Sequence, residues 1–116
     1  MANANRLRLC HLEQLAPGSA LGFRTKSIGH DDLFLVNDGR SIVGYKNSCP
    51  HWPGSTMPLL KDRYLDNDSR YIVCSGHGAL FEIASGLCIK GPCLGQYLTA
   101  VKLEVTEVGE VFLLGE

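Results

Sequence analysis

Two short motifs, each with one cysteine and one histidine, could bind a metal. The first is Cys49-Pro50-His51, and the second is Cys74-Ser75-Gly76-His77. Both spacings let the two side chains reach one metal centre, and each motif offers a soft thiolate and an imidazole. Four such ligands suit one tetrahedral zinc ion. They also suit a [2Fe–2S] cluster in which two cysteines hold one iron and two histidines hold the other.

The segments between turn signals predict short β-strands. Asn37-Asp38-Gly39-Arg40 separates two apolar runs, and Ala84-Ser85-Gly86 separates two more, as in β-hairpins. The predicted strands are 6–11, 33–36, 41–45, 70–73, 79–83, 87–89, 98–106 and 111–114, with a short helical turn at 12–16. Many short strands at regular spacing favour an all-β fold, an antiparallel β-sandwich or small barrel, with both ligand motifs in loops.

The size and charge of the chain limit the classes of protein to which it can belong. The 116 residues favour a single domain over 1–116, and a formal net charge of -1 provides no basic surface for nucleic acid. The start of the chain has no apolar run long enough for a signal peptide, and no segment approaches the ~18 apolar residues of a membrane span. We therefore expect a cytoplasmic protein that binds neither membrane nor nucleic acid. Its five cysteines are then expected to be ligands or free thiols.

Beyond the two motifs, the chain resembles the Rieske [2Fe–2S] proteins from about Arg6 to its end. The stretches that carry the resemblance are Val43 to Ser48, Ala79 to Glu82, Ser85 to Cys88 and Gly91-Pro92. The resemblance implies a Rieske-like antiparallel fold with a cluster-binding subdomain, formed by two loops, at about 46–94. It also implies one [2Fe–2S] cluster per chain. Cys49 and Cys74 would hold one iron, and His51 and His77 would hold the other.

The chain departs from the family pattern between the two motifs. Between His51 and Cys74 lie 22 residues, several more than the family usually has. We expect this insertion to be an exposed loop, because long surface loops cost little free energy. The resemblance also implies that Gly91-Pro92 belongs to a third loop, which covers the cluster. Cys88 and Cys93 flank this dipeptide and are either free thiols near the cluster or a disulfide.

The residues after the second motif bear on the reduction potential. High-potential members of the family carry hydroxyl side chains two and four residues after the second histidine ligand. These hydroxyls donate hydrogen bonds to a cluster sulfur and a ligand sulfur. In this chain Ala79 and Phe81 occupy the two positions and cannot donate. The resemblance therefore implies a reduction potential near the low end of the Rieske range.

The resemblance implies the function of a Rieske-type ferredoxin, a one-electron carrier between a reductase and a terminal oxygenase or other electron acceptor. Oxygenases of the family also need a mononuclear iron held by two histidines and a carboxylate. Only His11 and His30 remain for such a site, so we expect no substrate chemistry from the chain itself.

Two alternatives to a ferredoxin stay open. The first is the small subunit or an accessory domain of a larger redox enzyme, such as nitrite reductase. The second is a structural zinc or interaction module. Zinc fingers usually place both cysteines in one motif and both histidines in the other, so the mixed motifs of this chain favour iron–sulfur over zinc.

Overall fold

The fold is built from short antiparallel strands, as the sequence predicts. The computed structural model describes residues 6–25, 29–50, 57, 61–74 and 78–114. Its elements are β1 (Arg6–His11), the 3-10 helix η2 (Leu12–Gln14), β2 (Ser19–Phe23), β3 (Leu33–Asn37), β4 (Ile42–Lys46), β5 (Tyr71–Cys74), β6 (Ala79–Glu82), β7 (Cys88–Lys90), β8 (Leu103–Val105) and β9 (Glu110–Leu114). Every strand pair among these residues is antiparallel, which confirms the predicted all-β class.

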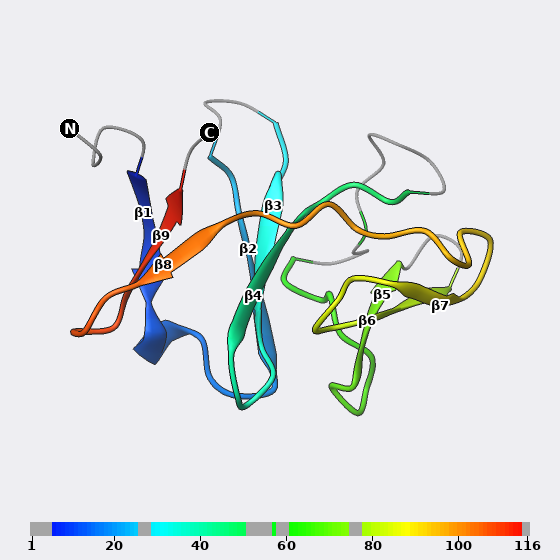
Figure 1. Ribbon diagram of the computed structural model, residues 1–116, viewed down its shortest axis with the longest axis horizontal. Coiled ribbons are helices and arrows are strands. Elements are labelled where there is room, and N and C mark those ends of the chain that lie inside the picture. Colours follow the sequence, from blue (N-terminus) through cyan, green and yellow to red (C-terminus); the bar gives the residue numbers. More distant parts are fainter. Residues whose placement is uncertain (1–5, 26–28, 51–56, 58–60, 75–77, 115–116) are drawn as a thin grey trace.

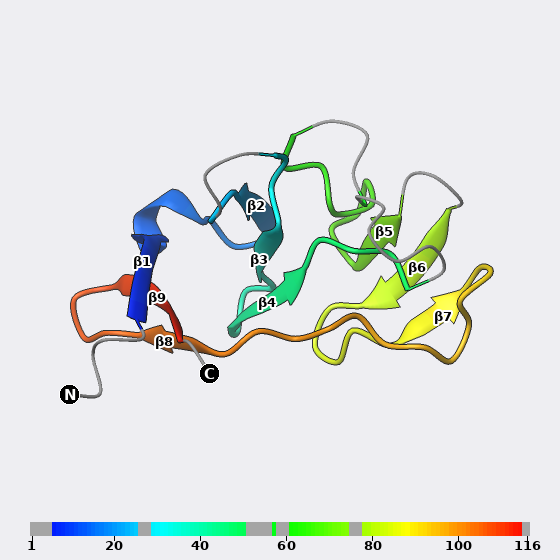
Figure 2. The same cartoon turned by 90° about the horizontal axis from the view of Figure 1, so that it is seen from above.

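Three small sheets follow one another along the longest axis of the molecule. The molecule measures 42 × 28 × 24 Å along its three principal axes. Their strand orders are β1-β9-β8, β2-β3-β4 and β5-β6-β7. Figures 1 and 2 show the β2-β3-β4 sheet in the middle, with the other two at opposite ends. Cys74, a predicted ligand, is the last residue of β5, so we name the β5-β6-β7 sheet the cluster-side sheet.

The middle sheet is apolar on both faces, and β3 explains why. Successive side chains of a strand point to opposite faces. Phe34 and Val36 belong to a core shared with the cluster-side sheet, while Leu33 and Leu35 belong to a second core shared with β1 and β9. All four side chains are buried. The uninterrupted apolar run 33–36 therefore reflects a strand packed on both sides.

The hairpin between β3 and β4 confirms the turn predicted at Asp38-Gly39. The Asp38 carboxylate accepts hydrogen bonds from the backbone N–H groups of Arg40 and Ser41, at 2.8 and 2.9 Å. The hydrogen bond from Ser41 has the largest effect on Asp38, and the bond from Arg40 the next largest. Both lower the pKa of Asp38 below its usual value. Val36 and Val43 face each other across the pair, and Asn37 faces Ile42.

The single strand predicted for 98–106 is wrong in detail, because this segment links two sheets. Residues 99–101 run beside β4, where the Lys46 N–H donates to Thr99 O at 2.8 Å and the Val101 N–H donates to Gly44 O at 3.0 Å. Only Leu103–Val105 then forms β8, against β9. Figure 1 shows the segment crossing the middle sheet on its way to β8.

The insertion before β5 is anchored in the core, so the expectation of an exposed loop is wrong for its described part. Met57 and Tyr64 are buried, at 1% and 0% exposure. The Tyr64 ring stacks on Phe34, with centroids 4.0 Å apart and an interplanar angle of 10°. The apolar burial of these two side chains outweighs the polar character of the surrounding sequence.

The insertion is also tied to β2 by polar contacts. The Lys61 ammonium donates to Gly22 O at 3.1 Å and to the carboxylates of Asp31 and Asp62 at 3.0 and 2.9 Å. The Gly22 N–H donates to Asp62 at 2.6 Å. A Cβ at Gly22 would lie 2.5 Å from an Asp31 oxygen and 2.7 Å from the Tyr64 hydroxyl, so only glycine lets the insertion approach β2 this closely.

Both edges of the cluster-side sheet are covered by further chain. On the β5 edge, the Val73 N–H donates to Tyr64 O at 2.8 Å, and Leu65 forms a bridge with Ile72. On the β7 edge, the Cys88 N–H donates to Gln96 O at 2.8 Å. The described part of the sheet thus has a backbone partner on each side.

We expect Tyr64→Phe to leave the protein as stable as the natural chain or to stabilise it by about 1 kcal/mol. The Tyr64 hydroxyl is buried and has no hydrogen-bond partner among the described residues, so its removal relieves a desolvation cost. Tyr64→Ala should instead lower the free energy of unfolding by about 3–5 kcal/mol, because it leaves a cavity beside Phe34. Denaturant titration measures both. A loss for Tyr64→Phe as large as that for Tyr64→Ala would contradict this account.

Candidate metal centre

Cys49 lies just after β4, at the start of the first ligand motif. The side chain is 1% exposed, and the Ser48 N–H donates back to Lys46 O at 3.0 Å, which turns the chain away from the strand. The β4 strand is held by β3 on one side and by residues 99–101 on the other. The thiol of Cys49 is therefore presented from a short turn on a rigid scaffold.

Cys74 ends β5, at the start of the second ligand motif. It faces Ala79 across the β5–β6 pair, and its side chain is 2% exposed. The Gly78 N–H donates to Cys74 O at 2.8 Å, so the loop that carries the motif is closed at its base. Gly78 has φ +70°, a conformation that glycine adopts without strain.

The structure brings Cys49 and Cys74 into one buried group. Both belong to the core between the middle and cluster-side sheets, and none of the five cysteines forms a disulfide. His51 and His77 lie outside the described residues. Two buried cysteine side chains, one on each loop, fit the thiolate half of a [2Fe–2S] site. The four-ligand set as a whole stays a prediction.

Cys88 and Cys93, which flank the predicted third loop, belong to the same core as Cys49 and Cys74. Cys88 and Cys93 are free and buried, at 1% and 0% exposure. The Cys93 thiol donates to Cys88 Sγ at 3.2 Å, and the Cys88 thiol donates to Lys90 O at 3.2 Å. The pKa of Cys93 is raised to about 12, mainly because the thiol is buried. The hydrogen bond with Cys88 and the charges of Cys88 and Cys49 raise this pKa further. Cys93 is therefore a neutral thiol at physiological pH.

Gly91 allows the predicted third loop to pack against the start of β6. A Cβ at Gly91 would lie 2.8 Å from Ala79 Cα, and the residue has φ +109°. The close contact and the positive φ both require glycine at this position. Because Ala79 faces Cys74 across the strand pair, this close approach places Gly91 beside the β5–β6 pair where β5 ends.

Asn47 fixes the chain on both sides of the first motif, a role that was not predicted from the sequence. Its side-chain amide donates to Asp31 O at 2.9 Å, and its side-chain oxygen accepts from the Met57 N–H at 2.8 Å. Its own N–H donates to Asp32 O at 2.9 Å. Asn47 is the one buried polar residue of the described core, at 5% exposure. A single amide thus anchors the chain before Cys49 and again at Met57.

We expect Asn47→Ala to make the metal centre labile. The substitution leaves the buried Met57 N–H and Asp31 carbonyl unpaired, at a cost of about 1–3 kcal/mol each. The visible absorption of the purified protein should then bleach several times faster in the presence of a chelator. Asn67→Ala, which removes an exposed amide, is the matched control and should bleach at the natural rate. Equal bleaching of the two variants would show that Asn47 does not hold the loop.

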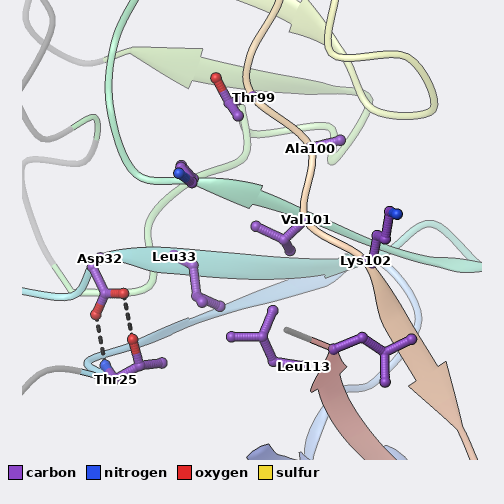
Figure 3. Close-up of a pocket in the computed structure, with 10 residues that line it drawn as sticks. Thr25, Asp32, Leu33, Thr99, Ala100, Val101, Lys102 and Leu113 are labelled. Carbon is purple, nitrogen blue, oxygen red and sulfur yellow. Dashed lines mark hydrogen bonds between the residues drawn. The ribbon is translucent and has the colours of Figure 1, made fainter. Parts of the chain in front are cut away.

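One cavity of the described part of the chain lies away from these cysteines. Its volume is about 410 Å³, and it opens where the middle sheet and β9 diverge. Figure 3 shows Leu33, Val101 and Leu113 around it, with Asp32 bonded to Thr25 at one end. Neither Cys49 nor Cys74 lines this cavity. The described residues also contain no group of three or more His, Cys, Asp or Glu side chains placed to hold a metal ion. None of the described helices is long and apolar enough to cross a membrane.

Comparison with known proteins identifies related chains. A family model described as the Rieske [2Fe-2S] domain matches residues 5–107. Ferredoxin CarAc of Metapseudomonas resinovorans is 29% identical over 110 residues, which cover 95% of this chain and 94% of that protein. The ferredoxin of carbazole 1,9a-dioxygenase from Nocardioides aromaticivorans IC177 is 25% identical, with a TM-score of 0.71 and coverage of 97% of this chain and 99% of that chain.

A second kind of relative has a similar fold. The putative NADH-dependent nitrite reductase small subunit from Mycobacterium tuberculosis is 20% identical, with a TM-score of 0.65. The match covers 93% of this chain and 92% of that chain. At this level of identity the likeness concerns the fold alone.

Proposed function

Because this chain belongs to the Rieske [2Fe-2S] domain family, we propose that it is a Rieske-type ferredoxin. It carries single electrons from a reductase to a terminal oxygenase or another acceptor protein. A [2Fe–2S] cluster, one per chain, is its cofactor, and the bound cluster supplies one-electron transfer. The observation that carries the proposal is the match to Ferredoxin CarAc over 94% of the length of that protein.

The ligands in this proposal are Cys49 and Cys74 on the buried iron and His51 and His77 on the outer iron. The burial of both cysteines supports the first half of the assignment, because thiolates inside the core are shielded from water and oxidants. Cys93, which is buried, belongs to the same core as the two cysteines. In this proposal residues 1–116 form one domain, and 46–94 form its cluster-binding part.

The proposed carrier works in the cytoplasm and needs neither a membrane nor nucleic acid. The isolated chain has no substrate chemistry of its own, so turnover depends on the acceptor. A role as the small subunit of a nitrite reductase is the second candidate, and the Mycobacterium tuberculosis protein shares only the fold with this chain. Stable co-purification with a large catalytic subunit would select this second candidate, because a ferredoxin binds its partners transiently.

Anaerobic purification followed by iron, sulfide and spectroscopic analysis tests the proposal. We expect two irons and two acid-labile sulfides per chain, a red-brown colour and an EPR signal on one-electron reduction. With a reductase present, the protein should pass electrons to an acceptor but consume no organic substrate. A colourless preparation with one zinc per chain would refute the ferredoxin and select the zinc module.

A further inference from the structure

Two buried thiols lie in contact in the core of the cluster-side sheet, and the proposed function gives neither of them a role. The Cys93 thiol donates to Cys88 Sγ at 3.2 Å, and the side chains of Cys88 and Cys93 are 1% and 0% exposed. Both are free, and both belong to the core that contains Cys49 and Cys74. Because the predicted ligand set does not include them, the pair is available for other sulfur chemistry.

The backbone around the two thiols forms a closed loop, residues 88–96, which we name the thiol loop. The Cys88 N–H donates to Gln96 O at 2.8 Å, and the Gly95 N–H donates to Cys88 O at 3.0 Å. The Gln96 N–H also donates to Cys93 O at 2.9 Å. These bonds keep Cys93 next to Cys88 without a contribution from a metal. Figures 1 and 2 show the loop directly after β7, at one end of the molecule.

The two sulfurs are near enough to form a disulfide after a small movement. A disulfide bond is about 2.0 Å long, so the sulfurs would have to approach each other by about 1.2 Å from the present 3.2 Å. Only four residues separate Cys88 from Cys93, so closing this short loop costs little chain entropy. Cys10 has no comparable partner, because it is the one cysteine of the second described core.

The closed thiol loop protects the pair from oxidants, but the pair lies close to the surface of the chain. Both thiols are buried, whereas Pro92 and Leu94, on either side of Cys93 in the sequence, are exposed. Segments with exposed residues open locally more readily than the core strands do. Oxidation of the pair therefore depends on a local opening of the loop and on an oxidant that is small.

We propose that Cys88 and Cys93 are an oxidation site, at which hydrogen peroxide forms a reversible disulfide that fastens the thiol loop. The inference does not depend on the proposed carrier function. In a reducing compartment disulfides are mostly transient. The free thiols of the structure are therefore the resting state, and the disulfide is the oxidised state.

The reaction has two steps and needs no reagent other than the peroxide. In the first step the sulfur of one thiol attacks a peroxide oxygen, the O–O bond breaks, and a sulfenic acid and one water form. In the second step the other sulfur attacks the sulfenic sulfur, the S–O bond breaks, and the disulfide forms with a second water. The two thiols thus supply two electrons and two protons to the peroxide. A dithiol reductant reverses the bond by thiol–disulfide exchange.

The disulfide would fasten the thiol loop against opening. A covalent link between Cys88 and Cys93 removes the open conformations in which these two residues separate. Gly91, inside the loop, approaches Ala79 so closely that a Cβ would lie 2.8 Å from Ala79 Cα. Because Ala79 is the first residue of β6, the fastened loop should stay packed on the cluster-side sheet.

Mass spectrometry of the purified holoprotein, treated with a small molar excess of hydrogen peroxide, tests the proposal. The treated protein is denatured in N-ethylmaleimide, which blocks free thiols, and is then digested with trypsin without a reductant. Trypsin cleaves after Lys90, so Cys88 and Cys93 lie on separate peptides, 71–90 and 91–102. We expect these two peptides to be linked after peroxide treatment and to separate when dithiothreitol is added.

Fragment ions and variants identify the two sulfurs of the bond. Peptide 71–90 also contains Cys74, and its fragments should place the bond at Cys88. Cys88→Ser and Cys93→Ser should each abolish the linked peptides. Cys10→Ser is the matched control, because it removes a buried thiol of the other core, and it should retain them. A bond at Cys74, or a natural protein whose Cys88 and Cys93 stay alkylated or are oxidised without a link, would overturn the proposal.

Hydrogen exchange measures the fastening of the loop. The backbone N–H groups of Gly95 and Gln96 should exchange severalfold more slowly in the peroxide-treated protein than in the untreated protein. The Ser41 N–H, in the hairpin between β3 and β4, is the internal control and should be unchanged. In Cys88→Ser, peroxide should have no effect on any of these groups. Unchanged exchange at Gly95 and Gln96 in a protein with linked peptides would also overturn the proposal, because the disulfide would not fasten the loop.

Discussion

His77→Ala is expected to abolish the visible and EPR spectra of the [2Fe–2S] cluster, or to leave a cluster that is lost during purification. Removing an imidazole ligand opens the outer iron to water and to chelators. Iron content, measured after anaerobic purification, should fall from two per chain towards zero. His30→Ala is the matched control, because His30 is exposed, and it should retain both spectra. Loss of the spectra in the folded His30→Ala variant would contradict the ligand assignment.

His11→Ala is a less suitable control, although we expect it to retain the cluster. The His11 ring caps the 3-10 helix, since its Nδ1 accepts a hydrogen bond from the Glu13 N–H at 3.1 Å. Its Nε2 also forms a hydrogen bond with Val108 O at 2.7 Å. Loss of such a cap costs about 1 kcal/mol, so lower stability in this variant would not report on the cluster.

The reduction potential of the natural chain is expected to lie near the low end of the Rieske range, roughly -150 mV. No hydroxyl at Ala79 or Phe81 stabilises the more negative, reduced cluster. The register supports the comparison, because Ala79 faces Cys74 and Phe81 faces Ile72, and both side chains are fully buried on the cluster side of the sheet. Protein-film voltammetry measures the potential.

The double substitution Ala79→Ser with Phe81→Tyr should raise the potential by tens of millivolts or more. Two added hydrogen bonds to a charged centre contribute on the order of 1.5–3 kcal/mol each to the reduced state. Leu80→Ser is the control, since it adds a hydroxyl between these positions but on the outer face of the strand, and it should leave the potential unchanged. A natural potential well above zero, or no rise in the double variant, would refute this explanation.

Sequence patterns located most strands because each is short, apolar and bounded by turn residues. The strand predicted at 6–11 coincides with β1, and the hairpin around Asp38-Gly39 is confirmed. Strand β2 was not predicted, because Ser19–Phe23 contains Gly22 and small residues that give a weak strand signal. Gly22 is needed for close packing between β2 and the insertion. Local strand propensity does not reflect this tertiary contact.

The insertion shows a different limit of sequence reasoning. The insertion is polar towards its end, so the apolar Tyr64-Leu65 pair before the turn at 66–69 was not predicted to be part of a hairpin. That pair is followed by Tyr71-Ile72, and the structure joins the two in a hairpin, with the Asp66 N–H donating to Tyr71 O at 3.0 Å. A hairpin search over shorter apolar pairs could have found it. Stacking of Tyr64 on Phe34, 30 residues apart, could not have been predicted from local sequence.

Cys49 and Cys74 are the two predicted ligands that the structure describes, and their assignment as ligands stays a prediction. Cys49 and Cys74 lie far apart in sequence, yet both motifs predicted a common centre, and the structure places both cysteines in one core. The supporting contact of Asn47 with Met57 was not predictable, because the side-chain amide bonds to a residue ten positions away in the sequence.

The covered edges of the cluster-side sheet bear on whether the newly made chain aggregates before it receives its cluster. Exposed strand edges invite pairing with other chains and lead to aggregates. Here Tyr64 and Leu65 cover β5, and Gln96 and Tyr97 cover β7, with hydrogen bonds that need no metal. Under iron starvation the cluster-free protein should therefore accumulate without forming fibrils or inclusion bodies, as a reserve that assembly factors can load once iron returns.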